Sequence, residues 1–307
     1  MILIITHKSD YTADYLINKL NENSISYYRL NCEDIPKTNY SLTYSKKFNL
    51  ELKGITNFHS VWFRRTKLPD LDDIKDLQER AYIINEFDAL LTNFYYTIKA
   101  DKWLSFPENI YKAENKVYQL KIASTIGFKI PDTLVTNNII ELQAFCKRCN
   151  YDVIIKPLSH GRIAYEEETK LIYTNKLKKE HIENLNSFSL TPSIFQKNIE
   201  KEYEIRVTMV GNKVFSAKVN SQENEETKID WRRKKLTFSS YILPHNIEVL
   251  CIDLLKKLDI SFGAIDLIKS IDGEYYFLEI NPNGQWAWIE IDTKAKISDA
   301  IIDYLLN

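Results

Sequence analysis

The stretch Tyr275-Tyr-Phe-Leu-Glu-Ile-Asn-Pro-Asn-Gly-Gln-Trp286 decides how the whole sequence is interpreted. Its aromatic and aliphatic first half predicts a strand, which the turn Asp272-Gly273 joins to a preceding strand, Gly263–Ser270. Side chains two residues apart on a strand share a face, so Glu279 and Asn281 are expected to point the same way. A carboxylate and a carboxamide in that arrangement supply the oxygen ligands that Mg²⁺ takes where it bridges phosphates.

Asp266 completes a candidate metal site with Glu279 and Asn281. It lies inside the apolar run Gly263-Ala-Ile-Asp-Leu-Ile268, where a carboxylate is costly to bury unless it is paired or binds a metal. A suitable register of the two strands would bring Asp266 beside Glu279. Taken alone, Glu279 also fits a solvent-facing strand carboxylate, and the three residues together favour the metal site.

Two lysines that precede this strand are candidates for binding nucleotide phosphates. Lys156 ends a predicted strand, Tyr151–Pro157, and precedes a loop of mainly small and polar residues, Leu158–Ala164. Lys116 lies in a predicted helix, Lys112–Ile126. A lysine binds a phosphate as a compact point charge. Either lysine alone is more often a surface residue. Its position relative to the strand that carries Glu279 and Asn281, here called the metal strand, favours the phosphate role.

A candidate site for the nucleotide base lies between the lysines and the metal strand. The predicted strand Ser193–Gln196 runs into a polar linker, whose backbone N–H and C=O groups can pair with an adenine edge while apolar neighbours cover the ring. Glu204 and Arg206 share one face of the next predicted strand, Tyr203–Val210. They offer an acceptor for ribose hydroxyls and a fork for phosphate oxygens. A cross-strand ion pair is the other interpretation of these two residues.

The composition excludes several classes of protein. The 307 residues are 44% hydrophobic and 27% charged, as in ordinary globular chains, and the net charge of −1 gives no overall attraction to nucleic acid or anionic membranes. The apolar run Ile2–Ile5 is too short for a signal peptide, and no stretch approaches the roughly 20 apolar residues that span a bilayer. Cys146-Lys-Arg-Cys149 has no accompanying Cys or His pair, so we expect reduced thiols rather than a zinc site. We therefore expect a cytoplasmic protein without a membrane partner.

The basic run Trp231-Arg-Arg-Lys-Lys235 is the segment that most resembles a nucleic-acid contact. It is short, and the rest of the chain is not basic, so we expect no nucleic-acid partner. An acidic peptide fits these residues better.

The order of elements predicts an α/β and α+β protein of three lobes, residues 1–105, 106–192 and 193–307. In the first lobe, strands alternate with helices, which is typical of a mainly parallel sheet, and Asp72–Lys99 is expected to form a long helix. No GxGxxG follows the first strand, so a dinucleotide site is not expected. The second lobe is a small α+β unit, and the third consists mostly of strands.

The linear order of these features resembles the ATP-grasp superfamily: a helix lysine, a strand-end lysine, a hinge, a Glu-x-Arg strand, and then Asp and Glu-x-Asn. Within it, the chain is similar to the microviridin-type graspetide synthetases, peptide maturases that form ω-ester or ω-amide crosslinks in ribosomal peptides. The motifs that carry this resemblance are Val61-Trp-Phe-Arg-Arg65, Gln196 with Lys201-Glu-Tyr-Glu-Ile-Arg-Val207, Asp230-Trp-Arg232 and Glu279-Ile-Asn-Pro-Asn-Gly-Gln-Trp286. The resemblance implies an ATP-grasp fold with an open α/β pre-ATP-grasp lobe first and ATP between the second and third lobes.

The resemblance also implies a role for each candidate residue. The nucleotide-binding residues would be Lys116, Lys156, Gln196, Lys197, Ile199 and Glu204. The catalytic residues, which act on the γ-phosphate and the acyl phosphate, would be Arg206, Arg232 and Lys156. The ligands of two Mg²⁺ ions would be Asp266, Glu279 and Asn281. The loop over the phosphates is usually rich in glycine and here contains only Gly161, so His160 or Arg162 is a candidate for direct phosphate contact.

Arg64 and Arg65 end a predicted strand of the first lobe, where α/β sheets usually place ligand groups. We expect at least one of them to bind an acidic substrate side chain, with surface charge as the alternative. The resemblance implies a homodimer and a precursor peptide with a leader and an acidic core, whose Asp or Glu carboxylates are joined to Thr or Ser hydroxyls or Lys amines. Two alternatives stay open: a carboxylate–amine ligase acting on a free amino acid or a protein C-terminus, and a non-catalytic ATP-binding regulator.

Overall fold

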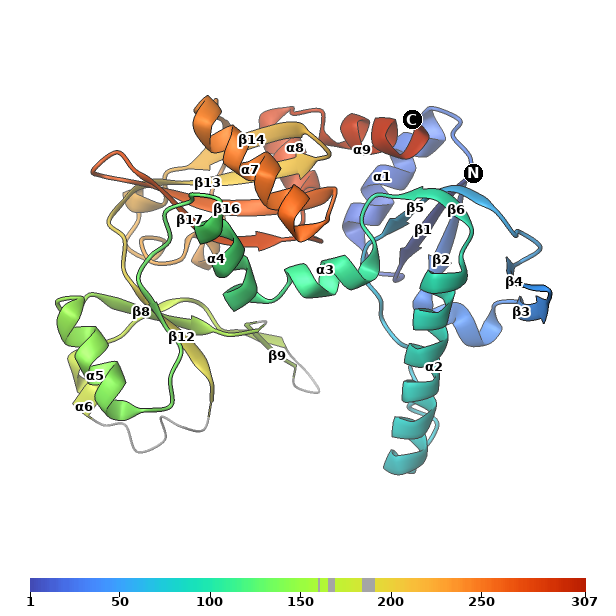
Figure 1. Cartoon of the computed structure of the whole chain (residues 1–307), viewed down its shortest axis with the longest axis horizontal. Helices are drawn as coiled ribbons and strands as arrows, with labels where there is room; N and C mark the ends of the chain where they lie inside the picture. Colours follow the sequence, from blue (N-terminus) through green and yellow to red (C-terminus); the bar gives the residue numbers. More distant parts are fainter. Residues whose placement is uncertain (160, 165–168, 184–190) are drawn as a thin grey trace.

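The computed structural model describes residues 1–159, 161–164, 169–183 and 191–307. It confirms the predicted mixed α/β and α+β architecture, with separate sheets in the N-terminal, central and C-terminal parts of the chain (Figure 1). Among the described residues, no helix has the length and apolar character needed to cross a bilayer.

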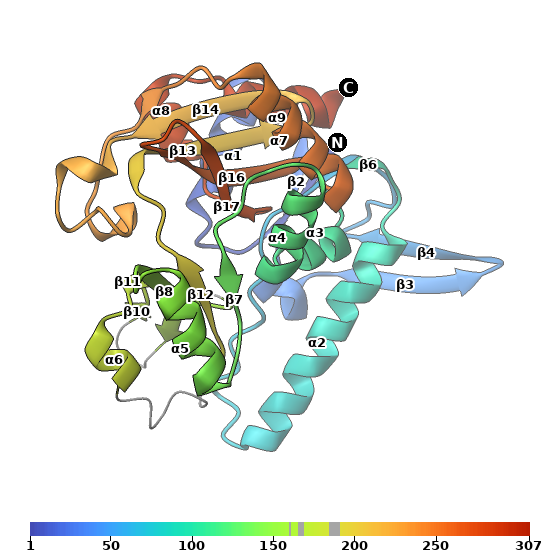
Figure 2. The ribbon, with the colours of Figure 1, turned by 60° about the vertical axis from the view of Figure 1, so that its left-hand side comes forward.

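The N-terminal lobe is built on a parallel sheet of order β2-β1-β5-β6, as predicted. Its strands are β1 (Ile2–Thr6), β2 (Tyr27–Asn31), β5 (Phe58–Phe63) and β6 (Ala100–Trp103). Around this sheet lie α1 (Tyr11–Glu22), η1 (Cys32–Lys37) and the hairpin of β3 (Tyr40–Ser45) with β4 (Lys47–Leu52). Helix α2 (Leu77–Thr97) projects from the body in both views (Figures 1 and 2). It begins five residues later than predicted, because the Asp76 carboxylate accepts the N–H groups of Gln78 and Glu79 and caps the helix there.

The predicted helix Lys112–Ile126 is two helices, α3 (Pro107–Ala113) and α4 (Lys116–Thr125). The break is at Asn115, whose side chain accepts the N–H of Tyr118 at 2.9 Å and caps α4. Lys116 is therefore the first residue of a helix rather than a residue in the middle of one.

The central lobe contains an antiparallel sheet of order β11-β8-β12-β7. Its elements are β7 (Thr133–Leu134), α5 (Ile139–Arg148), β8 (Val153–Pro157), β9 (Arg162–Ala164), β10 (Thr169–Leu171), β11 (Asn175–Lys176), α6 (Lys179–Glu183) and β12 (Ser193–Lys197). The expected loop Leu158–Ala164 ends in a short strand, because β9 pairs with β10. Cys146 and Cys149 are buried free thiols that belong to the hydrophobic core of the central lobe.

The C-terminal lobe is an antiparallel sheet of order β15-β14-β13-β16-β17. Its strands are β13 (Lys201–Val210), β14 (Lys213–Val219), β15 (Ser239–Ser240), β16 (Phe262–Ser270) and β17 (Tyr275–Asn281). Its helical elements are η3 (Ser221–Glu223), η4 (Trp231–Arg233), α7 (His245–Leu258), α8 (Ala287–Thr293) and α9 (Ile297–Leu306). The turn between β16 and β17 uses Gly273 at a φ of 87°, a conformation that disfavours other residues.

A β-bulge adjusts the register of β16 and β17. Close to the turn, Leu267 pairs with Phe277, whereas beyond it Asp266 pairs with Glu279, so Leu278 is the extra residue on β17. Without this bulge, Leu278 would face Asp266. The bulge therefore brings the two carboxylates opposite each other.

The N-terminal and C-terminal lobes share a hydrophobic core. Ile4 and Trp62 from the N-terminal sheet and Leu16 from α1 belong to the same buried cluster as Ile301 and Leu305 of α9. This shared core fixes how the first sheet sits against the end of the metal strand.

Candidate active site

A ladder of charged side chains crosses three strands of the C-terminal sheet. Arg206 of β13 lies opposite Asp266 of β16, which lies opposite Glu279 of β17. One guanidinium nitrogen of Arg206 donates to both Asp266 carboxylate oxygens at 2.8 Å. The Asn281 amide also donates to Asp266, at 3.3 Å. The structure thus brings Asp266, Glu279 and Asn281 together, as the sequence predicted.

Lys116 connects this ladder to the central lobe. Its ammonium group lies 3.4 Å from a Glu279 carboxylate oxygen and donates to the backbone carbonyl of Pro157 at 3.3 Å. Pro157 directly follows Lys156 on β8. The two predicted phosphate-binding lysines therefore converge on the same end of the site from different elements.

The charges in this site are strongly coupled. Burial alone would raise the pKa of Glu279, but Lys116, Lys156 and Arg232 outweigh it and lower that pKa to about 2. Removal from water lowers the pKa of Lys156 to about 8, although the Glu279 charge acts in the opposite direction. Burial is also the main reason why the pKa of Asp266 is raised, and Arg206 opposes it. The site therefore keeps Glu279 ionised and holds excess positive charge close to it.

Two carboxylates and one carboxamide are a donor set that fits Mg²⁺. Among the residues that the structure describes, no three His, Cys, Asp or Glu side chains form a metal cluster. Mg²⁺ needs no such cluster, because it binds one or two carboxylates and completes its octahedral shell with water and phosphate oxygens.

The predicted hinge begins in the last two residues of β12, Gln196 and Lys197. The Gln196 side chain is fully buried, and its amide nitrogen donates to the Thr133 hydroxyl at 2.8 Å. Within the described chain, the Gln196 amide oxygen has no hydrogen-bond partner. The backbone N–H of Lys197 donates to the carbonyl of Asp132 and so is already paired, while Ile199 lies half-buried beyond the strand.

Glu204 is paired with a residue that the sequence analysis did not single out. The Lys201 ammonium donates to Glu204 at 2.9 Å, and both side chains are almost fully buried. Burial raises the pKa of Glu204, and Lys201 opposes this shift. This ion pair runs along β13, whereas the alternative interpretation of a cross-strand pair describes Arg206, which is paired with Asp266.

Arg232 is held by Asp230. The guanidinium donates to both Asp230 carboxylate oxygens, at 2.8 and 2.6 Å, and this hydrogen bonding raises the pKa of Arg232. The Asp230 carboxylate also accepts the backbone N–H of Thr174 in the central lobe at 3.0 Å. The Asp-x-Arg spacing was a signal for this pair, but the contact with Thr174 could not be foreseen from the sequence.

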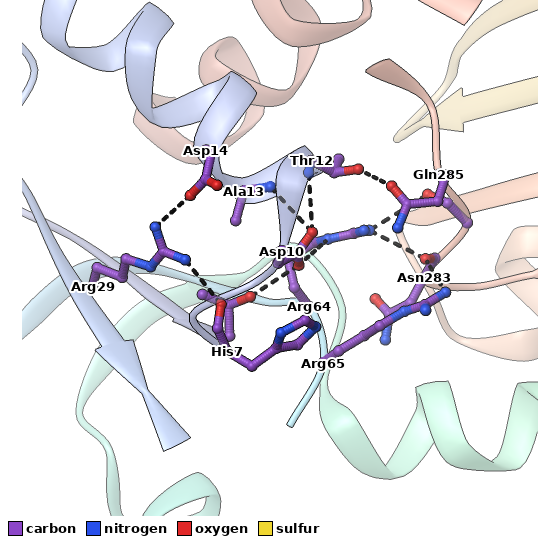
Figure 3. Close-up of polar contacts among 12 residues, drawn as sticks. His7, Asp10, Thr12, Ala13, Asp14, Arg29, Arg64, Arg65, Asn283 and Gln285 are labelled. Carbon is purple, nitrogen blue, oxygen red and sulfur yellow. Dashed lines mark hydrogen bonds and ion pairs between the residues drawn. The ribbon is translucent and has the colours of Figure 1, made fainter. Parts of the chain in front are cut away.

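Arg64 and Arg65 lie at the junction between the N-terminal lobe and the loop that follows Asn281 (Figure 3). Arg64 is fully buried; it lies 3.4 Å from the Asp10 carboxylate and donates to the Asn283 carbonyl at 3.2 Å. Asp10 caps α1, and its interaction with Arg64 helps to keep its pKa low against the effect of burial. Arg65 is only half-buried and donates to Asn283 at 3.4 Å. This corrects the expectation for Arg64, which is out of reach of a substrate because the loop covers it, and leaves Arg65 as the candidate substrate contact.

The two candidate phosphate contacts of the short loop are His160 and Arg162. His160 lies outside the described residues, and of Arg162 only the backbone is described.

Gln119 was missed by the sequence analysis. Its side chain is buried in α4 and forms hydrogen bonds with both backbone groups of Ile280, the residue between Glu279 and Asn281. A glutamine in an amphipathic helix carries no distinctive signal, because only the packing of the helix against β17 gives it these partners.

Two family models together match nearly the whole chain. A model described as the MvdD pre-ATP grasp domain matches residues 1–111, and one described as a RimK-like ATP-grasp domain matches residues 113–305. No sequence among curated proteins matches the chain.

Solved structures resemble the chain over nearly its full length. A RiPP-associated ATP-grasp ligase of Chryseobacterium gregarium, in complex with ADP and a leader and core peptide, is 32% identical, with a TM-score of 0.88 over 99% of this chain and 96% of that one. The macrocyclase MdnC of Microcystis aeruginosa MRC, bound with the precursor peptide MdnA, is 28% identical, with a TM-score of 0.88 over 100% and 99% of the two chains. The macrocyclase MdnB of the same organism is 29% identical, with a TM-score of 0.82 over 99% and 98%.

Proposed function

Since this chain belongs to the RimK-like ATP-grasp family and is an ATP-grasp ligase, we propose that it forms macrocycles in a ribosomal precursor peptide. It would phosphorylate Asp or Glu side-chain carboxylates and join them to Thr or Ser hydroxyls, as ω-esters, or to Lys amines, as ω-amides. The observation that carries this proposal is the ladder of Arg206, Asp266 and Glu279 with Lys116 on its open side.

The positive groups of the site suit the phosphates of ATP. We assign Lys116 and Lys156 to these phosphates, Gln196, Lys197 and Ile199 to the adenine, and Glu204 to the ribose. Lys116 and Arg206 are neutralised by Glu279 and Asp266 in the structure. Binding of ATP with Mg²⁺ would let these cations turn to phosphate oxygens, while Asp266, Glu279 and Asn281 hold two metal ions.

The chemistry then has two steps. A substrate carboxylate oxygen attacks the γ-phosphorus, the bond to the β,γ-bridging oxygen breaks, and ADP and an acyl phosphate form. A hydroxyl or amine then attacks the acyl carbon, loses its proton and expels inorganic phosphate. Arg206, Arg232 and Lys156 would stabilise the negative charge on the transferring phosphoryl group. Bound Mg²⁺ supplies neutralisation of the phosphate charge.

The substrate assignment rests on the N-terminal lobe and on the comparisons. Arg65 lies beside the loop that continues from Asn281, and its guanidinium is partly accessible. We assign it to the acidic side chain of the core peptide. The partner would be a precursor peptide with a leader, in the cytoplasm, and nucleic acid would have no part in the reaction.

We also propose a homodimer. The projecting helix α2 and the β3–β4 hairpin expose aromatic side chains, and burial of such groups against a second copy would be favourable. These exposed residues are Tyr40, Tyr44, Phe48, Tyr82 and Tyr96. Light scattering of the purified chain gives the mass of the assembly directly, and a monomer would contradict this part of the proposal.

The function is tested by incubating the purified chain with Mg·ATP and a short acidic peptide encoded beside it. We expect the peptide to lose one water for each bond formed, with one ADP released per water. Addition of an amino acid to a carboxylate, seen as a mass increase, would instead favour the alternative ligase. Nucleotide binding without any ADP release in the presence of peptide would indicate a regulator.

A further inference from the structure

Gln119 makes an unusual set of contacts for a helix residue. It lies in α4, is 2% exposed, and its amide oxygen accepts the Ile280 N–H at 3.0 Å. Its amide nitrogen donates to the Ile280 carbonyl at 2.8 Å and to the Ala113 carbonyl, the end of α3, at 2.6 Å. One side chain thus pairs with both backbone groups of a strand residue, as a neighbouring strand would.

Gln119 forms hydrogen bonds with a residue at the centre of the candidate metal site. Ile280 lies between Glu279 and Asn281 on β17, the edge strand of the sheet, whose outer side is bridged by Lys129 at Tyr276 and Phe277. The N–H and C=O groups of Ile280 would otherwise remain unpaired in the interior, which is costly. Gln119 therefore determines where α4 meets the metal strand.

Lys116 lies three residues before Gln119, so the two side chains project from the same side of α4. Lys116 reaches Glu279, and Gln119 reaches the next residue of the strand, Ile280. The helix is thus attached to β17 at two consecutive positions, by an ion pair at the surface of the site and by hydrogen bonds beneath it. The Lys116 ammonium group lies at the end of a flexible side chain. It therefore has a defined position only if the backbone of α4 is fixed.

We propose that Gln119 is a positioning residue, which locks α4 to β17 so that the Lys116 ammonium lies at the metal end of the nucleotide site. This proposal rests on the assignment of Lys116 to the ATP phosphates. Without the lock, α4 would lose its fixed register on the strand, and Lys116 would approach the phosphates in many geometries instead of one.

The first measurement is the affinity for Mg·ADP by calorimetry. Gln119→Leu keeps the volume and removes the hydrogen bonds, and we expect its Kd to rise about tenfold, a coupling of ordinary size for residues in contact. The matched control is Ser105→Ala, because the Ser105 hydroxyl is also buried and accepts backbone N–H groups, those of Ser261 and Phe262. Its Kd should stay within about twofold of that of the wild type.

Hydrogen exchange provides a measurement that needs no nucleotide. The Ile280 amide should exchange faster in Gln119→Leu than in the wild type, whereas it should be unaffected in Ser105→Ala. If exchange accelerates and the Kd stays unchanged, Gln119 serves stability alone and the proposal is overturned.

A double-mutant cycle separates positioning from general weakening. If Gln119 acts through Lys116, then Gln119→Leu should change the Kd less than about twofold in a chain that already carries Lys116→Met. Independent, multiplying effects would overturn the proposal. Should Gln119→Leu not fold, Gln119→Asn decides with the same cycle, because it keeps an uncharged amide in the interior and is too short to reach both backbone groups of Ile280.

The proposed function can fail separately. A wild-type chain that binds Mg·ADP and modifies no peptide would contradict the macrocyclase assignment and leave the comparison of variants valid. A wild-type chain that does not bind Mg·ADP would overturn both proposals.

Discussion

The nucleotide site and the lobe junction both pair buried or half-buried charges, but they do so in different ways. In the nucleotide site, the side chains of Lys116 and Glu279 are each 21% exposed. At the junction, the side chains of Arg64 and Asp10 are 0% and 1% exposed. Asp10 there receives hydrogen bonds from the Thr6 hydroxyl and from backbone N–H groups at the start of α1.

This difference in exposure indicates which ion pairs can separate when a ligand binds. An ion pair that is partly exposed separates at lower cost than a sealed one, because water can replace part of each partner. A sealed pair cannot, because separation leaves an uncompensated charge in the interior. We therefore expect substitutions in the site to affect activity and substitutions at the junction to affect stability.

The largest effect should follow from Glu279→Gln. Loss of a metal-binding carboxylate removes several kcal/mol of stabilisation of the transferring group, so kcat/KM should fall about 1000-fold. The melting temperature should fall modestly, because the cations that lower the pKa of Glu279 are themselves stabilised by its charge in the folded chain. The control is Glu274→Gln just before the same strand, where an exposed pair with Lys129 is lost. Normal turnover by Glu279→Gln would remove this residue from the metal site.

Arg64→Met should reduce the free energy of unfolding by about 3 kcal/mol, because it leaves Asp10 buried without its cation. Urea denaturation measures this directly. Lys213→Met is the matched control: both side chains of its pair with Asp303 are exposed, and a loss below about 0.5 kcal/mol is expected. If both variants are equally stable, the junction does not hold its charges as we describe.

Arg65→Ala should leave stability unchanged and raise the KM for the peptide about tenfold, as for the loss of one charged contact at a partly exposed site. The KM for ATP should stay the same. The exposed neighbour Lys67 serves as a control, since Lys67→Ala should change neither value. An effect of Arg65→Ala on ATP alone would place this arginine on the nucleotide instead.

The smallest effect concerns pH. The pKa of Lys156 is lowered to about 8, so the unliganded site loses this charge as the pH rises through 8. Anionic nucleotide binds the protonated form better, and the Kd for Mg·ADP should therefore rise several-fold between about pH 7.5 and 9.5. Lys156→Arg should flatten this profile, because arginine stays charged. A wild-type profile without slope would mean that Lys156 does not contact phosphate.

Local sequence patterns were sufficient to predict much of the fold and part of the candidate site. The hairpin turn Asp272-Gly273, the shared face of Glu279 and Asn281, and the parallel N-terminal sheet each depend on neighbouring residues or on alternation of elements. The cap at Asn115, which splits the expected helix, was also visible as a residue type but was outweighed by the long helical pattern.

What could not be predicted depends on distant packing. The bulge at Leu278 has no sequence signal of its own, yet it decides that Asp266 meets Glu279. The burial of Arg64 depends on a loop 219 residues later in the chain, and strand position alone suggested that both arginines were accessible. The partners of Gln119 exist only once α4 has docked on β17.

The core shared by β1, β5, α1 and α9 has a consequence for protein engineering. In chimeras that exchange the N-terminal lobe between relatives, the boundary near residue 112 between the two family models would be the natural cut. Such a cut would leave α9 and the Asn283–Gln285 loop facing a foreign partner. A functional graft has to carry the last helix and that loop along with the first 111 residues, so the exchangeable unit is discontinuous in sequence.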